Sequence, residues 1–290
     1  MIEYLYLGRV PYAEALRLQE ELVALRQQDR IGNVLLLLEH PPVLTLGRNA
    51  NRSNILASDE LLARRGVTLH EINRGGDVTY HGPGQLIGYP IFDLRSLRSP
   101  DARRLGPVDF VRIMEEALIR LCGEFGVHAG RICGLPGVWC HLRWGGPLDE
   151  SCGTIATDQP RGERKIAAIG IHVARGVTSH GFAFNVTTDL REFALINPCG
   201  ITDRPVTSLE MEVPGPETLP SLESLAHQAA RQFGQVFNEQ VLALDRLDAL
   251  RAQAQSDPGS EADFPAEDSP LQVPPEIERL RRSKDRPIRA

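Results

Sequence analysis

Runs of hydrophobic residues with two different spacings predict a chain in which strands and helices are interleaved. The continuous apolar run 33–39, which Pro41 and Pro42 stop, is typical of a buried strand. Apolar residues repeat at helical spacing over 107–125 and again over 222–237, which predicts two amphipathic helices. The pattern also predicts strands at 2–8, 43–46, 67–72, 86–94, 127–132, 138–142, 166–174 and 182–186, a helix opened by Pro11, and a short helix from Ser58 to Arg65 that Gly66 ends.

These elements do not follow the regular strand–helix–strand rhythm of a doubly wound sheet. The sequence therefore predicts an α+β fold, in which a mixed or antiparallel sheet is flanked by helices. We expect a single domain over 1–250. The polar, glycine-rich stretch 143–163 is interpreted as an extended surface loop. The segment 251–290 is rich in Pro, Glu, Asp and Ser and ends Arg-rich, which predicts a disordered tail.

Charge and cysteine usage narrow the classes of protein to consider. A formal net charge of −6 argues against a general nucleic-acid binder. We recognise no signal peptide and no apolar run long enough to cross a membrane, so we expect a cytoplasmic protein without membrane association. The spacing of Cys133, Cys140, His141 and Cys152 matches no usual zinc pattern, so no metal site is expected.

The glycine-rich segment 74–85 (Arg-Gly-Gly-Asp-Val-Thr-Tyr-His-Gly-Pro-Gly-Gln) is the best candidate for a substrate site. Its glycines allow sharp turns and a close approach of backbone to a ligand, and its polar side chains supply hydrogen bonds. Arg74 could bind an anion or a carbonyl, and the N–H groups of Gly75 and Gly76 could face an oxyanion. For His81 we favour binding over catalysis. The spacing fits neither GxGxxG nor a phosphate-binding Walker loop.

Lys165 is one of only two lysines in the chain, the other being Lys284. Strand alternation predicts that Lys165 shares a face with Ala167, Ile169, Ile171 and Val173. A strand-end lysine whose ammonium reaches water is the ordinary interpretation. The functional interpretation is a partly desolvated amine that is available for proton transfer.

Cys199 lies between turn-forming residues, in Asn197-Pro198-Cys199-Gly200. A thiol presented on a tight loop is a candidate nucleophile, and a neighbouring ammonium would favour its thiolate. A buried structural cysteine is the alternative. The triplet 181–183 (Gly-Phe-Ala) offers small and aromatic walls to a ligand, although ordinary core packing explains it equally well.

Six blocks together resemble the octanoyltransferases of lipoate biosynthesis. The blocks occur in order, and the similarity extends from the N-terminus to about residue 212. They are 39–48 (Glu-His-Pro-Pro-Val-Leu-Thr-Leu-Gly-Arg), 74–85, 136–139 (Pro-Gly-Val-Trp), 165–170 (Lys-Ile-Ala-Ala-Ile-Gly), 180–185 (His-Gly-Phe-Ala-Phe-Asn) and 196–200 (Ile-Asn-Pro-Cys-Gly).

The resemblance implies a biotin/lipoate protein ligase-like fold and a reaction. The reaction is transfer of an octanoyl group from octanoyl-acyl carrier protein to a lysine of lipoyl domains. The family's nucleophilic cysteine falls on Cys199, and the lysine that lowers the pKa of this cysteine and transfers protons falls on Lys165. Its substrate-binding residues fall on Arg74, Gly75, Gly76, Asp77, Val78, Thr79, Tyr80, His81, Ala168, Ile169, Gly170, Gly181, Phe182 and Ala183.

The resemblance also implies the partners. The expected acceptors are the lipoyl domains of 2-oxoacid dehydrogenases and the glycine cleavage H protein. No cofactor of the enzyme's own is expected, because phosphopantetheine arrives on the acyl carrier protein. The chain departs from the family in 143–163, which is longer than usual and counts as an inserted loop, and in 251–290, which lies outside the similarity.

Two other functions remain open from the sequence. The first is an ATP-dependent lipoate or biotin ligase of the same fold, which would need no cysteine nucleophile. The second is a non-catalytic protein that binds lipoyl domains or acyl carriers. An arginine cluster could dock an acidic carrier, although such clusters are more often only solvated. The cluster consists of Arg95, Arg98, Arg103 and Arg104.

Overall fold

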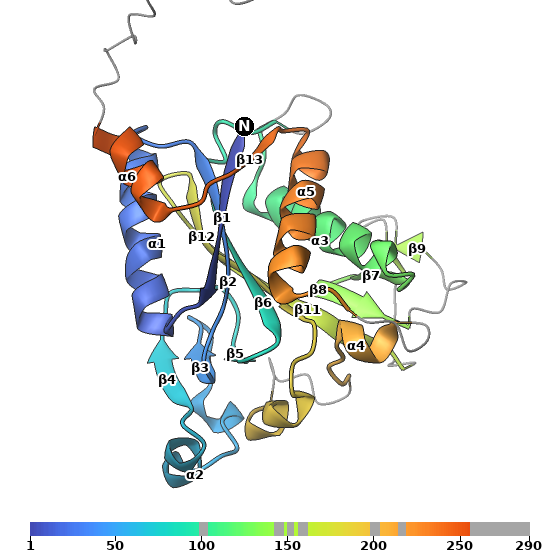
Figure 1. Cartoon of the computed structure of the whole chain (residues 1–290). Coiled ribbons are helices and arrows are strands. Elements are labelled where there is room, and N and C mark those ends of the chain that lie inside the picture. Colours follow the sequence, from blue (N-terminus) through green and yellow to red (C-terminus); the bar gives the residue numbers. More distant parts are fainter. Residues whose placement is uncertain are drawn as a thin grey trace, which may run out of the picture. The chain divides into compact units, whose positions relative to one another are not determined.

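A ten-stranded mixed sheet is the framework of the protein (Figure 1). The computed structural model describes residues 1–98, 104–141, 162–197, 204–213 and 219–255, together with the backbone of 148–149 and 154–155. The strand order is β13-β1-β2-β6-β12-β11-β8-β7-β10-β9, with parallel pairs at β13–β1, β1–β2 and β7–β10 and antiparallel pairs elsewhere. The strands are β1 (Ile2–Arg9), β2 (Asn33–Glu39), β6 (Gln85–Ile91), β7 (Ala129–Ile132), β8 (Leu135–Cys140), β9 (Leu148–Asp149), β10 (Thr154–Ile155), β11 (Arg164–Ala174), β12 (Val177–Asn185) and β13 (Val241–Ala243).

A second, three-stranded sheet has the order β4-β3-β5. It comprises β3 (Val43–Leu46), β4 (Thr68–Glu71) and β5 (Val78–His81). A small apolar cluster lies under it, in which Leu44 and Tyr80 contact Leu62 of the short helix α2 (Asp59–Arg64). As predicted, the side chain of Ser58 caps this helix by accepting a hydrogen bond from the N–H of Leu61.

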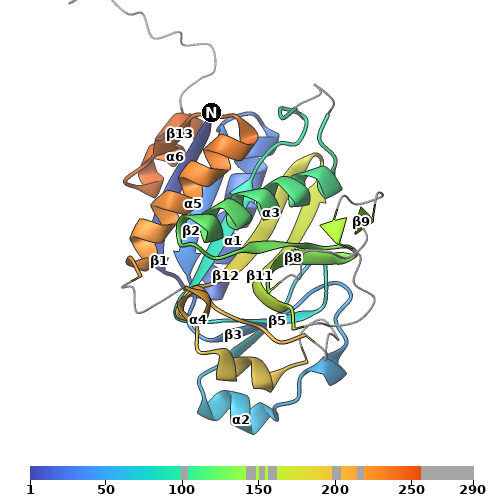
Figure 2. The same ribbon diagram turned by 90° about the vertical axis from the view of Figure 1, so that its right-hand side faces the viewer.

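Helices cover both faces of the ten-stranded sheet. Helix α1 packs on one face, and α3 and α5 pack on the other, as Figures 1 and 2 show. The larger core lies under α3 and α5, where Phe110 and Phe233 are fully buried. The helices are α1 (Tyr12–Gln27), α3 (Pro107–Glu124), α4 (Leu209–Glu212), α5 (Leu222–Phe237) and α6 (Leu247–Gln255), with short 3₁₀ turns η1 (Arg52–Asn54) and η2 (Leu190–Leu195).

The fold class predicted from the sequence is confirmed: α+β, with mixed sheets flanked by helices. Three local expectations change. Strand β5 runs through the middle of the glycine-rich segment, and α6 continues to Gln255, past residue 250 where the tail was expected to begin. Within the expected loop 143–163 the structure describes β9 and β10. The residues 256–290 lie outside the described part of the chain.

Neither a membrane helix nor a metal cluster is found in the part of the chain that the structure describes. No helix there is both long and apolar enough to cross a membrane. The same residues hold no group of three or more His, Cys, Asp or Glu side chains arranged to bind a metal ion. Cys122 and Cys140 are free and buried, and burial raises the pKa of both thiols, that of Cys140 to about 12. Cys133 is disulfide-bonded, a state that a reducing cytosol does not favour.

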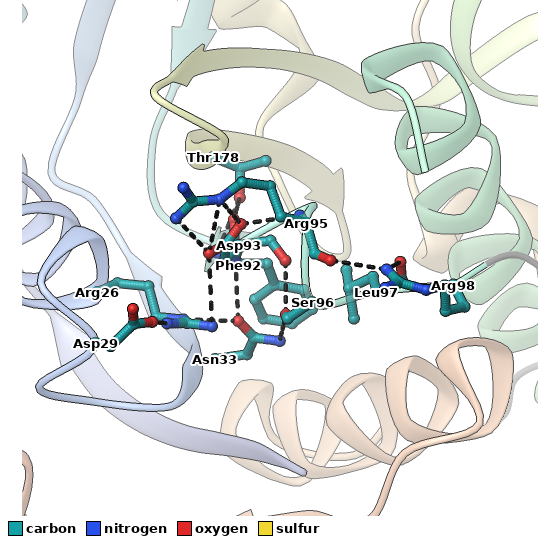
Figure 3. A network of polar contacts seen from close by, with 10 residues as sticks. All are labelled: Arg26, Asp29, Asn33, Phe92, Asp93, Arg95, Ser96, Leu97, Arg98 and Thr178. Carbon is teal, nitrogen blue, oxygen red and sulfur yellow. Dashed lines mark hydrogen bonds and ion pairs between the residues drawn. The ribbon is translucent and has the colours of Figure 1, made fainter. Parts of the chain in front are cut away.

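A polar network around the buried carboxylate of Asp93 joins α1, β2 and the end of β6 (Figure 3). Arg95 donates to both oxygens of this carboxylate, and Asp93 N–H donates to Oδ1 of Asn33 at 3.0 Å. Burial tends to raise the pKa of Asp93, but the hydrogen bonds from Arg95 outweigh it and hold the pKa below its usual value. Arg98 donates to the carbonyls of Arg95 and Leu97. Two of the four arginines considered for docking are therefore engaged within the protein itself.

Candidate functional site

A cavity of about 350 Å³ lies between the β11–β12 ladder and the glycine-rich segment. Its volume falls within the usual range for sites that bind small molecules. Apolar surface makes up most of its wall. The polar groups come from the glycine-rich segment, from Tyr12 of α1, and from Asn49, Tyr89, Lys165 and His180. The lining residues are Tyr12, Asn49, Arg74, Gly76, Asp77, Thr79, His81, Tyr89, Gly134, Leu135, Pro136, Lys165, Ala168, Ile169, Gly170, His180, Gly181, Phe182 and Ala183.

The guanidinium of Arg74 holds the glycine-rich segment in its folded shape. It donates to the carbonyl of Gly75 at 2.7 Å, to the carbonyl of Asp77 at 2.7 Å, and to Oγ1 of Thr45 at 3.4 Å. The sequence suggested that Arg74 binds an anion or a carbonyl. The carbonyls that it binds are those of its own segment, so it supports the cavity wall that it also lines.

Gly170 allows the glycine-rich segment to close onto β11. Gly75 donates its N–H to the carbonyl of Ile171 at 3.1 Å. A Cβ atom on Gly170 would lie 2.7 Å from the carbonyl oxygen of Gly75 and 2.9 Å from the guanidinium of Arg74. Any side chain at this position would push the segment away from the strand, so the glycine is a geometric requirement of the cavity.

Strand alternation divides the glycine-rich segment between two environments. Thr79 and His81 line the cavity, whereas Val78 and Tyr80 point to the opposite face of β5 and are buried in the small apolar cluster. The ring of Tyr80 packs edge-on against Phe193 at 5.5 Å between centroids. The side chains of 74–81 therefore do not all face the cavity, because in strand β5 every second side chain points to the opposite face.

His81 is held as a neutral imidazole with a defined tautomer. Gln85 uses its amide nitrogen to donate to Oδ1 of Asn185 at 2.8 Å, so its Oε1 is an acceptor. The Nδ1–H of His81 donates to that oxygen at 2.8 Å. Burial, followed by the neighbouring His40, lowers the pKa of His81 to about 3. At neutral pH the Nε2 of His81 therefore carries a lone pair and no proton.

Tyr12 and Tyr89 continue this uncharged wall, and His40, which does not itself line the cavity, contacts both of them. The Nδ1–H of His40 donates to the carbonyl of Val10 at 2.7 Å, so Nε2 accepts from the hydroxyl of Tyr89 at 2.7 Å. Burial lowers the pKa of His40 to about 4 and raises the pKa of Tyr12 and Tyr89. The rings of Tyr12 and His40 lie 5.1 Å apart. This side of the cavity thus offers hydrogen-bonding groups without charge.

Lys165 lies on the cavity side of β11 because the strand contains a bulge. Lys165 pairs with Trp139, but Ala167, two residues later, pairs with Val138, the adjacent residue of β8. Ile166 and Ala167 are both fully buried in the larger core. The predicted common face of Lys165 and Ala167 was therefore wrong. The Nζ atom lies 4.6 Å from the centroid of the Trp139 ring, which is a cation–π distance.

Backbone hydrogen bonds fix the chain on both sides of residues 198–203. Lys165 donates its N–H to the carbonyl of Pro205 and accepts from the N–H of Thr207, both at 2.9 Å. On the other side, Asn197 donates its N–H to the carbonyl of Asn54 at 2.7 Å. Cys199, the predicted nucleophile, lies outside the described residues.

The structure brings most of the predicted site residues together around one cavity, and it adds others. Gly75, Val78 and Tyr80 do not line the cavity. Predicted residues that do line it are Arg74, Gly76, Asp77, Thr79, His81, Lys165, Ala168, Ile169, Gly170, Gly181, Phe182 and Ala183. Sequence reasoning had not assigned Tyr12, Asn49, Tyr89, Gly134, Leu135, Pro136 and His180 to the site.

The motifs could have signalled two of these additional residues. His180 and Pro136 belong to the blocks 180–185 and 136–139, which were recognised as blocks but not assigned to the site. Tyr12 and Tyr89 had no such signal, because an aromatic residue at a helix start or within a strand is ordinary core composition.

Comparison with known proteins gives a consistent picture. Residues 11–234 match the family model described as the lipoyl protein ligase A/B catalytic domain. The chain is 59% identical over 246 residues to an octanoyltransferase of Acidobacterium capsulatum, covering 84% of this chain and 94% of that protein. It is 51% identical over 250 residues to an octanoyltransferase of Koribacter versatilis, covering 86% and 90%.

Solved structures share the fold at low sequence identity. A bipartite lipoate protein ligase from Thermoplasma acidophilum superposes with a TM-score of 0.60 at 16% identity, over 88% of this chain and 91% of that chain. Lipoate-protein ligase A bound with ATP superposes with a TM-score of 0.57 at 15% identity, over 88% and 93%. At these identities the likeness concerns the fold alone.

Proposed function

Because this chain belongs to the octanoyltransferases, within the family of lipoyl protein ligase A/B catalytic domains, we propose that it uses octanoyl-acyl carrier protein as donor and a specific lysine of lipoyl domains as acceptor. Family membership makes the protein an acyltransferase of protein lipoylation. The proposal adds the donor, the acceptor and a covalent intermediate on Cys199. The observation that supports it best is Lys165, which lies on an apolar cavity while its backbone is fastened to Pro205 and Thr207.

In the first step the thiolate of Cys199 attacks the carbonyl carbon of the octanoyl thioester. The carbon–sulfur bond to phosphopantetheine breaks, and the leaving thiolate takes a proton from the ammonium of Lys165. An octanoyl thioester on Cys199 and a neutral Lys165 amine remain. Before the attack, the Lys165 ammonium favours the thiolate form of the cysteine electrostatically.

In the second step the amine of the target lysine attacks this new thioester. The amide bond forms, the bond to Cys199 Sγ breaks, and the proton lost by the attacking nitrogen passes to the amine of Lys165. The ammonium and the thiolate are thereby restored. Thioester exchange is nearly balanced in free energy and amide formation is favourable, so the cycle consumes no ATP and calls for no cofactor of the enzyme's own.

The apolar part of the cavity is the proposed site of the acyl chain. Ala168 pairs with Ala183 across the ladder, and Ile169 pairs with Phe182 on the next rung. Burial of each methylene contributes about 0.8 kcal/mol, so an eight-carbon chain gains affinity without any charged contact. Phe182 also packs against Phe233, which joins this wall to the larger core.

Gly170 and Gly181 form the following rung, and together with the glycine-rich segment they complete the proposed substrate site. Within that segment Thr79 and His81 contact the substrate through side chains, and Gly76 through backbone. Gly75, Val78 and Tyr80 act by holding the segment in place.

Intact-mass measurement tests the proposal most directly. Mixed with octanoyl-acyl carrier protein, the protein should gain the mass of one octanoyl group, and Cys199→Ala should gain none. Adding a lipoyl domain of a 2-oxoacid dehydrogenase, or the glycine cleavage H protein, should move the adduct to the acceptor. Product from free octanoate and ATP, with none from the acyl carrier, would instead identify a ligase. Partner binding and cellular function that survive in Cys199→Ser would indicate a non-catalytic role.

A further inference from the structure

His180 has an unusual backbone conformation in the middle of β12. Its φ angle is 56°, in the left-handed region that residues other than glycine seldom adopt. Its N–H donates to the side chain of Gln19 on α1 at 2.8 Å. A left-handed residue inside a strand costs on the order of 1 kcal/mol or more, and such conformations cluster at functional sites. The backbone is therefore held in a strained form that determines where the imidazole lies.

Among the residues that the structure describes, only one nitrogen of the His180 imidazole has a hydrogen-bond partner. Nε2 lies 2.7 Å from Oδ1 of Asn73 and donates to it. Nδ1 is buried and has no hydrogen-bond partner in the part of the chain that the structure describes. The residue as a whole is only 2% exposed. Burial, followed by the charge of Arg74, lowers the pKa of His180 to about 3, so Nδ1 carries a lone pair at neutral pH.

The position of His180 along the ladder relates it to the rest of the cavity. Lys165 lies near one end of the lining part of β11. The rungs that follow are Ala168–Ala183, Ile169–Phe182 and Gly170–Gly181, and the next rung is Ile171–His180. His180 is thus the last lining residue along the ladder, six positions of β11 beyond Lys165, and the lining side chains on the intervening rungs are apolar.

We propose that His180 is the polar end of the acyl-chain site and sets the upper limit of acyl-chain length. This inference rests on the function proposed above, because it needs the acyl group to extend along the ladder from Lys165. A chain that ends before His180 leaves Nδ1 to a solvent molecule. A longer chain must press an alkyl group, which has no hydrogen to donate, against a buried acceptor.

The energetic consequence is a penalty that depends on chain length. A buried acceptor left without a partner costs free energy. This cost opposes the binding free energy that each further methylene would otherwise contribute. The site should therefore lose affinity once the chain reaches His180. Removal of the imidazole should leave room for the alkyl chain without this buried acceptor. Longer chains should then regain the binding free energy of each further methylene.

His180→Gly tests this because glycine adopts the left-handed backbone without strain. The rates of transfer are compared for hexanoyl, octanoyl, decanoyl and dodecanoyl carriers, and the binding of the free fatty acids is compared by calorimetry. We expect the ratio of decanoyl to octanoyl kcat/KM, and the corresponding ratio of binding constants, to rise about tenfold, because two further methylenes become buried. His180→Asn, which also tolerates this backbone, should keep the polar end and change the ratio less.

His172→Ala is the matched control. His172 lies on the neighbouring strand and is only partly buried, and it does not line the cavity. The chain-length profile of His172→Ala should equal that of the wild type.

A wild-type protein that transfers no octanoyl group would contradict the proposed function itself. If the wild type is active, and folded His180→Gly has the same decanoyl-to-octanoyl ratio of kcat/KM as the wild type, the inference about His180 is overturned and the proposed function stands. If His180→Gly does not fold, the wild-type profile decides the inference: a decanoyl kcat/KM equal to or above the octanoyl value would overturn it.

Discussion

Asn54 donates a side-chain hydrogen bond to the carboxylate of Asp77, which ties the 3₁₀ turn η1 to the glycine-rich segment. The other oxygen of Asp77 accepts from the N–H of Asn51 at 3.0 Å. The carbonyl of Asn54 in turn accepts from the N–H of Asn197, two positions before Cys199. One carboxylate therefore connects the cavity wall with the chain that leads to the proposed nucleophile.

Asp77→Ala should slow octanoylation of Cys199 about tenfold or more. The substitution leaves the N–H of Asn51 and the amide of Asn54 without their acceptor, so Asn197 loses a fixed anchor. Asp77 acts by holding Asn54, which in turn anchors Asn197. The single-turnover rate of acylation should therefore fall, while the affinity for octanoate changes less. Asp245→Ala, on a residue outside the cavity lining, is the control. Equal loss of both quantities in Asp77→Ala would mean that Asp77 contacts the substrate directly.

Gly170→Ala should nearly abolish activity at a moderate cost in stability. The new methyl group would lie 2.7 Å from the carbonyl oxygen of Gly75, so the glycine-rich segment has to move off β11. We expect a decrease of about 1–3 kcal/mol in the free energy of unfolding, from denaturant titration. Gly123→Ala is the matched control, since a Cβ atom there meets nothing within 4 Å and helix α3 gains from alanine. Unchanged kcat/KM in Gly170→Ala would show that the segment can relax freely.

Lys165→Arg should separate the two half-reactions. The guanidinium keeps the positive charge and can stack on Trp139, but it does not give up its proton. Octanoylation of Cys199 should therefore survive in part, whereas transfer to the lipoyl domain should fall by about a hundredfold or more. Rapid-quench measurements with intact-mass detection follow both steps. Wild-type transfer rates in this variant would remove Lys165 from proton transfer.

The buried histidines should make the folded state sensitive to acid. Burial lowers the pKa of His40 to about 4 and the pKa of His81 and His180 to about 3. The unfolded chain takes up protons near pH 6.5, so the stability from these neutral imidazoles is complete above that pH. It is lost as pH falls toward 3–4, at about 1.4 kcal/mol per pH unit for each histidine.

Denaturant titration between pH 7 and pH 4 measures this dependence. His40→Gln removes one of the three titrations, so its free energy of unfolding should fall less steeply with acid than that of the wild type. The exposed His128→Gln provides the comparison. A His40→Gln curve parallel to the wild-type curve would mean that His40 does not contribute through protonation.

Local sequence patterns were sufficient for most of the secondary structure. Helical spacing predicted α3 and α5, and the apolar run 33–39 predicted β2 with the same bounds. These elements depend on the period of the hydrophobic residues, which can be read within a short window of sequence. The resemblance to octanoyltransferases likewise indicated most of the cavity lining, because the substrate-binding residues that it implied lie in 74–81, 168–170 and 181–183.

Tertiary structure decided which side chains face the cavity. The bulge between Lys165 and Ala167 arises from pairing with β8, and no local spacing in β11 reveals it. Tyr12 and Tyr89 reach the site only because α1 and β6 pack beside His40. The sequence determined which elements form, since that depends on neighbours along the chain. The direction of Lys165 and the burial of His180 depend on residues far away in sequence, and only the packed fold brings those residues together.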